Sequence, residues 1–308
     1  MDIVPYDPDW LPQLASLARA HARLVAPFLV PSDEEVAAGL EHHAFWRFYS
    51  PSLDAAQTLL AVSNGQVLAA TQTGFVGHGW GYGAVEGDGP DWLQEVHCSL
   101  FWLFAWPGWP EAQEAGSQLA AAVVGWARKE GLPGVEAFRG GPGFLRFGTQ
   151  LSSRWPHVWG PLRACGFRQP RDLLVYGGDV AADGLPPSTA VEGLTFRARS
   201  ERLEAWLEGE PVALCSAHPL SRARDGLPPE DPRAKEWVAI RRLVVDSSVR
   251  GRGIGTALLA EQLRRLSARG VKRFLLHIPD DVDEAPARAL YAKFGGVVDR
   301  QQVLRLSF

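Results

Sequence analysis

The pattern of hydrophobic positions in the second half of the chain switches between the two-residue period of strands and the longer period of helices. Leucines recur at helical spacing, so we expect a helix over 256–269 that ends at Gly270, and a second helix over 286–294. Short apolar or alternating runs predict strands at 194–199, 203–208, 212–217, 236–245, 273–278 and 302–308.

The first half of the chain shows a similar order. Ser32 and Glu35 have the spacing of a capping box at the start of an expected helix over 32–49. Asn64-Gly65 favours a tight hairpin between two alternating runs. The other expected elements are helices at 11–24, 114–130 and 161–165 and strands at 58–63, 66–73, 98–106 and 172–176.

These two patterns indicate a diverged internal repeat. The segment LLAVSNGQVLAA at 59–70 parallels LEAWLEGEPVALC at 203–215, and LRACGF at 162–167 parallels YAKFGG at 291–296. The segment 179–190 has small residues, Pro and Gly without hydrophobic periodicity, which is typical of a linker. We therefore predict an α/β protein of two units, at 1–180 and 190–308, each a mixed central sheet flanked by helices.

Composition and charge narrow the classes of function. The 308 residues are 46% hydrophobic and 21% charged, which is ordinary for a globular protein. The net charge of −4, with both signs interspersed, argues against a nucleic-acid partner. Three widely spaced cysteines fit reduced thiols in a cytoplasmic protein. No signal peptide is read in the first residues, and no apolar run approaches the roughly 20 residues that span a bilayer, so we expect no membrane partner. His42 and His43 lack ligand spacing, and no metal is expected.

The most distinctive segment is the glycine loop, Arg250-Gly251-Arg252-Gly253-Ile254-Gly255, between a predicted strand and a predicted helix. The first N–H groups of a helix have no partner within it, and the helix dipole places partial positive charge there. Glycines let the main chain approach a phosphate closely, and the two arginines add charge. The loop therefore predicts a pyrophosphate site, with a solvated turn as the alternative. A Walker A loop would require a lysine, and a dinucleotide fingerprint a third glycine where Thr256 stands.

The segment RRLVVDSSVRGRGIGTALL, at 241–259, resembles motif A of the GNAT superfamily of acetyltransferases. The signature Gln/Arg-x-x-Gly-x-Gly/Ala falls on Arg250, Gly253 and Gly255. The resemblance implies that main-chain amides of the loop bind the pyrophosphate of coenzyme A. These are the amides of Arg250, Gly251, Arg252, Gly253, Ile254, Gly255 and Thr256. It also implies that the strand edge at Leu243 and Val245 pairs with pantetheine. A strand N–H near Val244 is expected to polarise the thioester carbonyl.

The segment ARALYAKFG, at 287–295, resembles the last helix of the same family. In that family a tyrosine in this helix commonly protonates the departing thiolate, and Tyr291 stands at its place. A tyrosine that only packs in the core is the alternative. The resemblance covers the chain from about residue 194 to the C-terminus by motif, and the first half by architecture alone.

The expected general base departs from the family pattern. Many relatives carry a glutamate four residues ahead of the position of Val245, where this chain has Arg241. Glu236, on the same predicted strand, is the substitute we expect, with a plain surface carboxylate as the alternative. His218 and Asp225 are further candidates. Only residues 200–202 separate the first two strands, where the family has two helices, so we expect the N-terminal unit to wall the acceptor pocket.

The N-terminal unit is expected to lack the coenzyme site. Aligning Gly116 with Gly255 places Glu111 and Glu114 at loop positions, where carboxylates would repel a pyrophosphate. Leu162 then falls opposite Tyr291. We read this unit as a degenerate GNAT-like domain with a structural or acceptor-binding role.

These features predict an acyl-CoA-dependent N-acetyltransferase with acetyl-CoA as cosubstrate. An amine of a small molecule or peptide would attack the thioester directly, assisted by a base and by Tyr291 as acid. The layout of two units is similar to that of mycothiol synthase, in which the C-terminal unit is the active one. The alternative is a non-catalytic acyl-CoA-binding regulatory or scaffolding protein, and a nucleotide-binding enzyme ranks third.

Overall fold

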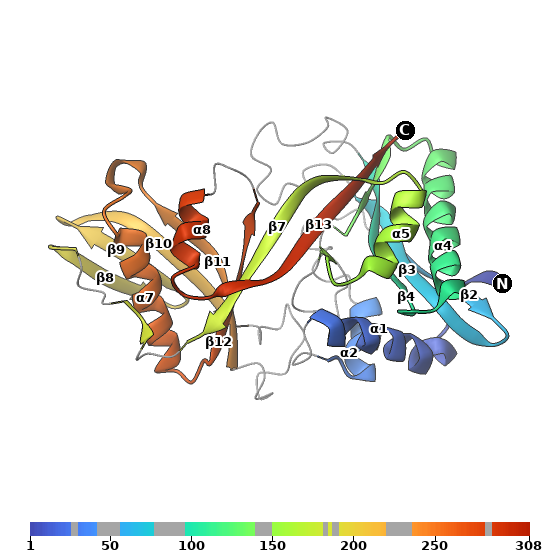
Figure 1. The fold of residues 1–308 in the computed structure, drawn as a ribbon, viewed down its shortest axis with the longest axis horizontal. Helices are drawn as coiled ribbons and strands as arrows, with labels where there is room; N and C mark the ends of the chain where they lie inside the picture. Colours follow the sequence, from blue (N-terminus) through green and yellow to red (C-terminus); the bar gives the residue numbers. More distant parts are fainter. Residues whose placement is uncertain are drawn as a thin grey trace. The chain divides into compact units, whose positions relative to one another are not determined.

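The computed structural model of the chain forms two compact units. The N-terminal unit comprises Met1–Asp172 and Gln301–Phe308, and the C-terminal unit comprises Leu173–Arg300 (Figure 1). The residues that the structure describes are 1–25, 30–41, 56–76, 96–138, 150–180, 184–186, 191–219, 236–280 and 285–308.

The N-terminal unit contains a mixed sheet and flanking helices. Its strands are β1 (Asp2–Pro5), β2 (Gln57–Ser63), β3 (Gln66–Val76), β4 (His97–Ala105), β5 (Gly134–Ala137), β6 (Leu151–Ser152) and the last residues of β13 (Gly296–Ser307). Its helices are the 3-10 turn η1 (Pro8–Trp10), α1 (Leu11–Val25), α2 (Asp33–Glu41), α4 (Pro110–Lys129) and α5 (Pro156–Ala164).

Helices cover both faces of this sheet, whose strands run in the order β1-β2-β3-β4-β5-β13. Among the described residues of this sheet, β4–β5 is the only parallel pair. His21 of α1 stacks on Phe104, whereas Gly116 of α4 lies against Ala105, the next residue of β4. Because adjacent residues of a strand point to opposite faces, α1 and α4 cover opposite faces.

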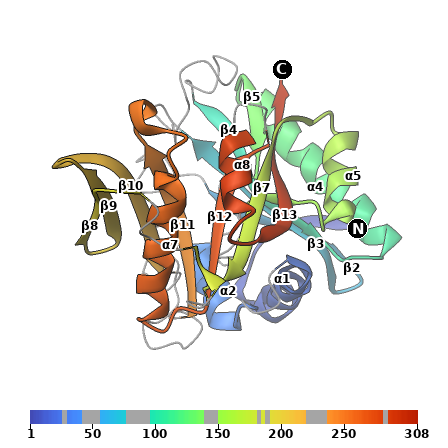
Figure 2. The same ribbon diagram turned by 60° about the vertical axis from the view of Figure 1, so that its left-hand side comes forward.

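The C-terminal unit repeats this topology. Its strands are the last residues of β7 (Arg168–Asp179), β8 (Leu194–Arg199), β9 (Arg202–Leu207), β10 (Glu210–Pro219), β11 (Trp237–Val245), β12 (Arg273–Pro279) and the first residues of β13. Its helices are the 3-10 turn η4 (Ser247–Val249), α7 (Ile254–Ser267) and α8 (Ala285–Tyr291). In the described part of this unit, the order β8-β9-β10-β11-β12-β7 has one parallel pair, β11–β12 (Figure 2).

The predicted internal repeat is confirmed in detail by the fourth strand of each sheet. In β4, Phe101 is the extra residue of a β-bulge, because Gln72 pairs with Trp102 and Thr73 pairs with Leu100. In β11, Arg241 is inserted in the same way opposite β10. In both units the parallel pairing with the fifth strand stops just before this bulge.

Two strands are placed differently from the expected ranges 1–180 and 190–308. β7 follows α5 in the chain, but from Leu173 it belongs to the sheet of the C-terminal unit, next to β12. β13 follows α8, but from Gln301 it completes the sheet of the N-terminal unit, next to β5. Each sheet therefore takes its sixth strand from the chain segment that follows the other unit's last helix. The assignment of separate roles to 1–180 and 190–308 stays a prediction.

Local predictions are largely confirmed, with differences at element ends. Glu35 N–H donates to Ser32 Oγ at 3.2 Å and Ser32 N–H donates to Glu35 Oε2 at 2.8 Å, which is the expected capping box. Asn64 and Gly65 both have positive φ, as the expected hairpin turn requires. α4 begins at Pro110 rather than 114, because proline suits the first helical position. The remainder of the helix expected over 32–49 lies outside the described residues.

No helix in the described ranges is long and apolar enough to cross a membrane.

Candidate functional site

The glycine loop links the end of β11 to the start of α7 through a turn that only glycine adopts readily. Asp246 Oδ1 accepts hydrogen bonds from Ser248 N–H at 2.9 Å and Ser248 Oγ at 2.7 Å, and these bonds hold the pKa of Asp246 below its ordinary value. Gly251 has φ of 77° and Gly253 has φ of 83°, both in the left-handed region. The chain therefore reverses within a few residues and enters α7 directly.

The loop presents a group of backbone N–H donors to solvent. The first helical turn is closed by a bond of 3.0 Å from Ala257 N–H to Gly253 O. Within the described part of the chain, no backbone carbonyl accepts a hydrogen bond from the N–H groups of residues 251–256. Residues 250–253 are exposed. The exposed donors among them, at the positive end of a helix dipole, form a fitting cradle for a phosphate or pyrophosphate.

Gly255 is also required for packing. It is buried, and a Cβ atom there would lie 2.9 Å from Leu290 Cδ1 and 3.3 Å from Val245 Cγ2. A side chain would therefore push α8 and β11 away from the start of α7. The sequence does not show this packing role, because the tertiary contacts of Gly255 are visible only in the fold, and the expected contact of its N–H with the pyrophosphate stays a prediction.

The strand edge expected to bind pantetheine has no strand partner in the described part of the chain. β11 pairs with β12 only as far as Ile240, and beyond that residue it pairs with β10 alone. Asp246 N–H bonds to Val212 O at 2.9 Å, and backbone groups alternate between the two edges of a strand. Leu243 and Val245 therefore direct their backbone groups to the open edge, whereas Val244 directs its N–H to β10.

Two consequences follow for the roles expected of this strand. An N–H donor toward a thioester oxygen would come from Leu243 or Val245 rather than from Val244. The open edge is also approached by Arg250, whose Nε donates to Val245 O at 3.1 Å. The guanidinium thus lies back over the start of the loop, where it adds positive charge to the cradle.

Tyr291 lies on the helical side of the sheet, near the point where β11 and β12 separate. Its ring centroid is 5.9 Å from that of Tyr176 on β7. Tyr176 pairs with Leu276, which in turn pairs with Ile240, the last β11 residue joined to β12. The preceding residue of α8 is the leucine that contacts Gly255. The fold therefore brings Tyr291 and the glycine loop to one region of the C-terminal unit.

The structure does not bring Glu236 to this region. Its carboxylate forms an ion pair with Lys272, and its carbonyl accepts from Lys272 N–H at 2.8 Å. It precedes the bulge at Arg241 by five residues, which is about 16 Å along a strand. That separation exceeds the reach of a hydrogen bond, so the role of Glu236 as base finds no geometric support.

His218 and Glu201 form a pair at the bulge instead. His218 Nδ1 lies 2.8 Å from Glu201 Oε2, with 37% of the histidine side chain exposed and 13% of the glutamate. His218 stands opposite Ala239, and the pairing slips between this level and Arg242. A carboxylate that accepts from Nδ1–H fixes a tautomer in which Nε2 is the basic nitrogen.

The short β8–β9 connection creates this pair. Because β8 returns into β9 without intervening helices, Glu201 falls beside the end of β10, where Ala217 N–H donates to its carbonyl at 3.0 Å. In the sequence, His218 is only one of several candidates. The sequence feature that could have singled out His218 is the short connection between β8 and β9. The sequence shows this connection, but it does not show that the connection places Glu201 beside His218. Asp225 lies outside the described residues.

The N-terminal unit lacks the loop because α4 starts earlier than α7. Gly116 lies against Ala105 and Pro161, just as Gly255 lies against β11 and α8, so these glycines are equivalent. The residues that precede Gly116 are helical from Pro110, and the helix replaces the loop. The expected alignment is thus supported by the contacts.

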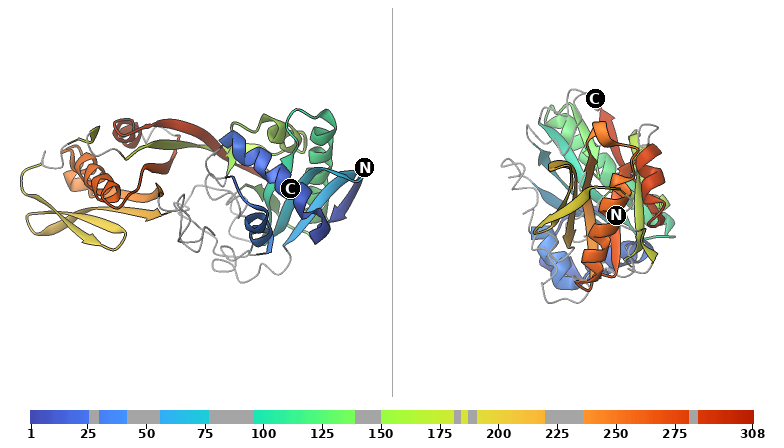
Figure 3. Two further views of the ribbon diagram at one scale, coloured as in Figure 1. Left: turned by 90° about the horizontal axis from the view of Figure 1, so that it is seen from below. Right: turned by 90° about the vertical axis from the view of Figure 1, so that its left-hand side faces the viewer.

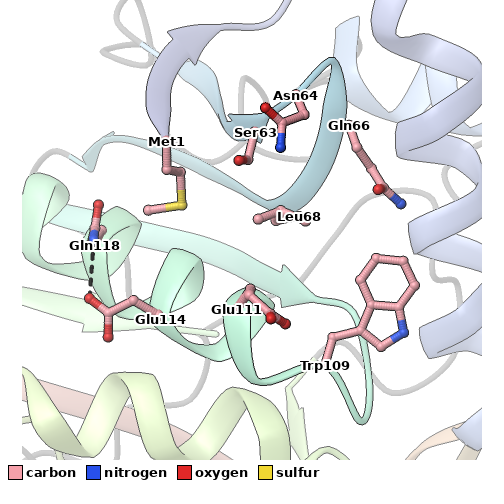
Figure 4. Close-up of a pocket in the computed structure, with 9 residues that line it drawn as sticks. All are labelled: Met1, Ser63, Asn64, Gln66, Leu68, Trp109, Glu111, Glu114 and Gln118. Atoms are coloured by element: carbon pink, nitrogen blue, oxygen red, sulfur yellow. Dashed lines mark hydrogen bonds between the residues drawn. The ribbon is translucent and has the colours of Figure 1, made fainter.

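An open cavity of about 480 Å³ lies beside this helix start (Figure 4). Glu111 and Glu114 line it together with Trp109, and Gln118 Nε2 donates to Glu114 Oε1 at 3.0 Å. Two carboxylates disfavour a pyrophosphate at this place. Among the described residues no group of three or more His, Cys, Asp or Glu side chains is arranged to hold a metal ion.

The two units share one strand order and a bulge in the fourth strand. These features define the class of protein as a tandem GNAT-like α/β fold. Residues 181–296 match the model of the Acetyltransferase (GNAT) family, and this segment is a GNAT-family domain. No curated protein sequence matches the chain.

Solved structures with a similar fold include one tandem GNAT protein. A tandem GNAT protein from the clavulanic acid biosynthesis pathway is 14% identical with a TM-score of 0.60, over 99% of this chain and 98% of that chain. A GCN5-related N-acetyltransferase from Sphaerobacter thermophilus is 17% identical with a TM-score of 0.61, over 99% and 95% of the two chains. At these identities the likeness concerns the fold.

A third structure is longer than this chain. The glucosamine N-acetyltransferase region of a fungal multi-domain β-N-acetylglucosaminidase is 14% identical with a TM-score of 0.65, over 99% of this chain. The present chain spans 38% of that protein.

Proposed function

We propose that the protein is an acyl-CoA-dependent N-acetyltransferase whose C-terminal unit binds acetyl-CoA and transfers its acetyl group to an amine of a small molecule or peptide. The observation that supports this proposal most directly is the group of unused N–H donors at residues 251–256, which lies at the end of a strand edge without a strand partner in the described ranges. The match of residues 181–296 to the acetyltransferase family supports it independently.

In this proposal the glycine loop holds the pyrophosphate, and Arg250 and Arg252 add charge to that contact. The backbone groups of Leu243 and Val245 pair with the pantetheine amides in the manner of an added strand. The Arg250 side chain then exchanges its bond to the Val245 carbonyl for one to phosphate, which guanidinium groups favour.

Acetyl-CoA would supply an electrophilic thioester carbonyl and a thiol leaving group. The attacking amine must lose a proton, and His218 Nε2 accepts it while Glu201 holds the other ring nitrogen. The N–H of Leu243 or Val245 donates to the carbonyl oxygen as negative charge develops there. Tyr291 donates a proton to the thiol sulfur as the carbon–sulfur bond breaks and the carbon–nitrogen bond forms.

The cysteines bear on the proposed location of the protein, and the proposed reaction indicates its partners. All three cysteines are unpaired in the structure, which fits a reducing cytoplasmic setting. The amine acceptor and acetyl-CoA are the partners that the proposed reaction requires.

Titration calorimetry with acetyl-CoA tests the coenzyme site. We expect saturable binding to the wild-type protein and at least a tenfold weaker affinity for Gly253→Val, because a β-branched residue disfavours the left-handed conformation of the loop. Gly65→Val is the matched control, since Gly65 also has positive φ and open space but lies in the other unit. The absence of heat with the wild-type protein, or equal weakening by both variants, would refute the coenzyme site.

Thiol release from acetyl-CoA over a panel of amines tests the transfer. Release with at least one amine, lowered by Tyr291→Phe, is the expected result. Binding of acetyl-CoA with no release for any amine would refute catalysis and favour the regulatory alternative.

A further inference from the structure

Arginines form a row across four strands of the C-terminal unit. Arg199 of β8 pairs with Arg202 of β9, Arg202 pairs with Ser216 of β10, and Ser216 pairs with Arg242 of β11. Residues directly opposite one another on neighbouring strands point to the same face. We call Arg199, Arg202 and Arg242 the arginine row.

The arginine row lies on the face opposite α7. The neighbouring row, formed by Leu203, Cys215 and Leu243, packs into the core beneath α7. Since adjacent strand residues alternate between faces, the arginines point the other way. Figure 3 shows α7 on one side of β8, β9 and β10. The side chains of the arginine row are exposed.

The charge of this row is not neutralised within the described part of the chain. No hydrogen bond or ion pair in that part involves the guanidinium groups of Arg199, Arg202 and Arg242. Glu204, one row away on the same face, accepts from Trp206 Nε1 at 3.2 Å. Glu201 is paired with the imidazole of His218. Like charges directly opposite one another, as at Arg199 and Arg202, destabilise a sheet slightly, and a bound anion would remove this repulsion.

The arginine row extends to the bulge of β11, where we propose that the reaction occurs. Arg242 follows the bulge at Arg241, which is also exposed, and β10 carries His218 and Ser216 on the same face as the row. The coenzyme approaches from the glycine loop and occupies the edge of β11. A second reactant therefore has to approach the thioester from another direction, and the face of the arginine row leads to the proposed base.

We infer that the acceptor is a small amine that also carries a phosphate or carboxylate group, which the arginine row holds while the amine faces His218. This inference rests on the proposed acetyltransferase function. Neighbouring strands lie about 4.8 Å apart, so the row extends over about 14 Å from Arg242 to Arg199. An anionic group about 5–10 Å from the amine would thus lie over Arg242 and Arg202. Guanidinium groups bind both anions with paired hydrogen bonds.

Matched pairs of acceptors test the inference. Initial rates are measured with glucosamine 6-phosphate against glucosamine, and with an α-amino acid against its amide, so that each pair differs in one anionic group. For at least one pair, kcat/KM of the anionic member should exceed that of the neutral member by tenfold or more. Tenfold corresponds to about 1.4 kcal/mol. The preferred pair also distinguishes phosphate from carboxylate.

Arginine variants separate binding of the anion from a structural effect. Arg202→Gln and Arg242→Gln should lower kcat/KM for the anionic acceptor by about tenfold and thereby reduce its ratio to the neutral twin. Arg269→Gln removes one charge from an exposed position after α7, and its ratio should equal that of the wild type. An equal loss for both members of a pair would mean that the row acts through folding, and would overturn the inference.

Two further outcomes would also overturn it. Equal rates for both members of every pair, in a protein that binds and turns over acetyl-CoA, would refute the anionic acceptor and leave the proposed function intact. Failure to bind acetyl-CoA in the same samples would refute the proposed function itself. Binding of a random-sequence RNA oligonucleotide that Arg202→Gln abolishes, without a change in acceptor ratio, would assign the row to nucleic acid.

Discussion

Lowering the pH should destabilise the N-terminal unit through two buried histidines. His21 of α1 lies 2.9 Å by its Nδ1 from Leu17 O, and its Nε2 lies 2.8 Å from Nε2 of His157 on α5. The carbonyl can only accept, so Nδ1 of His21 carries the proton and Nε2 accepts from His157. Burial is the main cause that lowers the pKa of His21 to about 3 and that of His157 to about 4, from an ordinary value of 6.5.

The sign and size of the effect follow from these values. At pH 7 both histidines are neutral in the folded and unfolded states, and their stabilising arrangement is complete. As the pH falls below 6.5, the unfolded chain takes up protons that the folded unit cannot, so stability is lost until the pH passes the folded pKa values. At pH 5 the loss is about 2 kcal/mol for each histidine, and on the order of 4 kcal/mol for both.

Urea unfolding followed by tryptophan fluorescence measures this loss, because Trp102 and Trp155 are buried in the same unit. We expect the free energy of unfolding to fall by several kcal/mol between pH 7.5 and pH 5. In His157→Gln the fall should be roughly half as large, because one titrating group is gone and its amide can still donate to His21. A free energy that stays constant over this range would refute the reasoning.

Three further substitutions test the packing of Gly255, the proposed catalytic role of His218, and the attachment of β13 to the sheet of the N-terminal unit. Gly255→Ala should lower the free energy of unfolding by about 1–3 kcal/mol through overpacking, whereas Gly125→Ala, in an open helical position, should be neutral or stabilising in the same thermal melts. His218→Gln should lower kcat by about 100-fold and leave the calorimetric affinity for acetyl-CoA unchanged; a wild-type kcat would exclude it as base. Arg305→Gln removes the 3.1 Å ion pair with Glu136, which is 1% exposed and keeps His97 Nε2 at 3.8 Å, and should cost about 1–3 kcal/mol. Little change on urea unfolding would contradict a role for this pair in holding β13.

Local sequence patterns predicted the elements that short-range interactions decide. The capping box at Ser32, the turn at Asn64-Gly65 and the helix after the glycine loop all depend on residues a few positions apart. The loop itself could be recognised because its chemistry lies in one continuous stretch. Helix starts were less well predicted, since Pro110 and Pro156 each extend a helix beyond the apolar repeat that revealed it.

The proposed base, and the placement of β7 and β13 in the sheet of the other unit, could not be read from the same patterns. Glu236 shares a strand with the loop, yet it lies at the paired end of β11, and only the register with β12 shows this. His218 and Glu201 are far apart in the chain and meet because β8, β9 and β10 are adjacent in the sheet. Strand registers are set by packing of whole sheets, so a reading along the chain leaves them undetermined.

The sequence by itself thus determined the fold class, the repeat and the glycine loop that we propose binds an anion, because periodicity, turn residues and a helix start are local properties of the chain. Only the tertiary structure decided which strand completes each sheet, where β11 leaves β12, which histidine stands at the bulge and on which face the arginines gather. These features join residues that are distant in sequence, and their positions follow from cross-strand register and core packing rather than from any single segment.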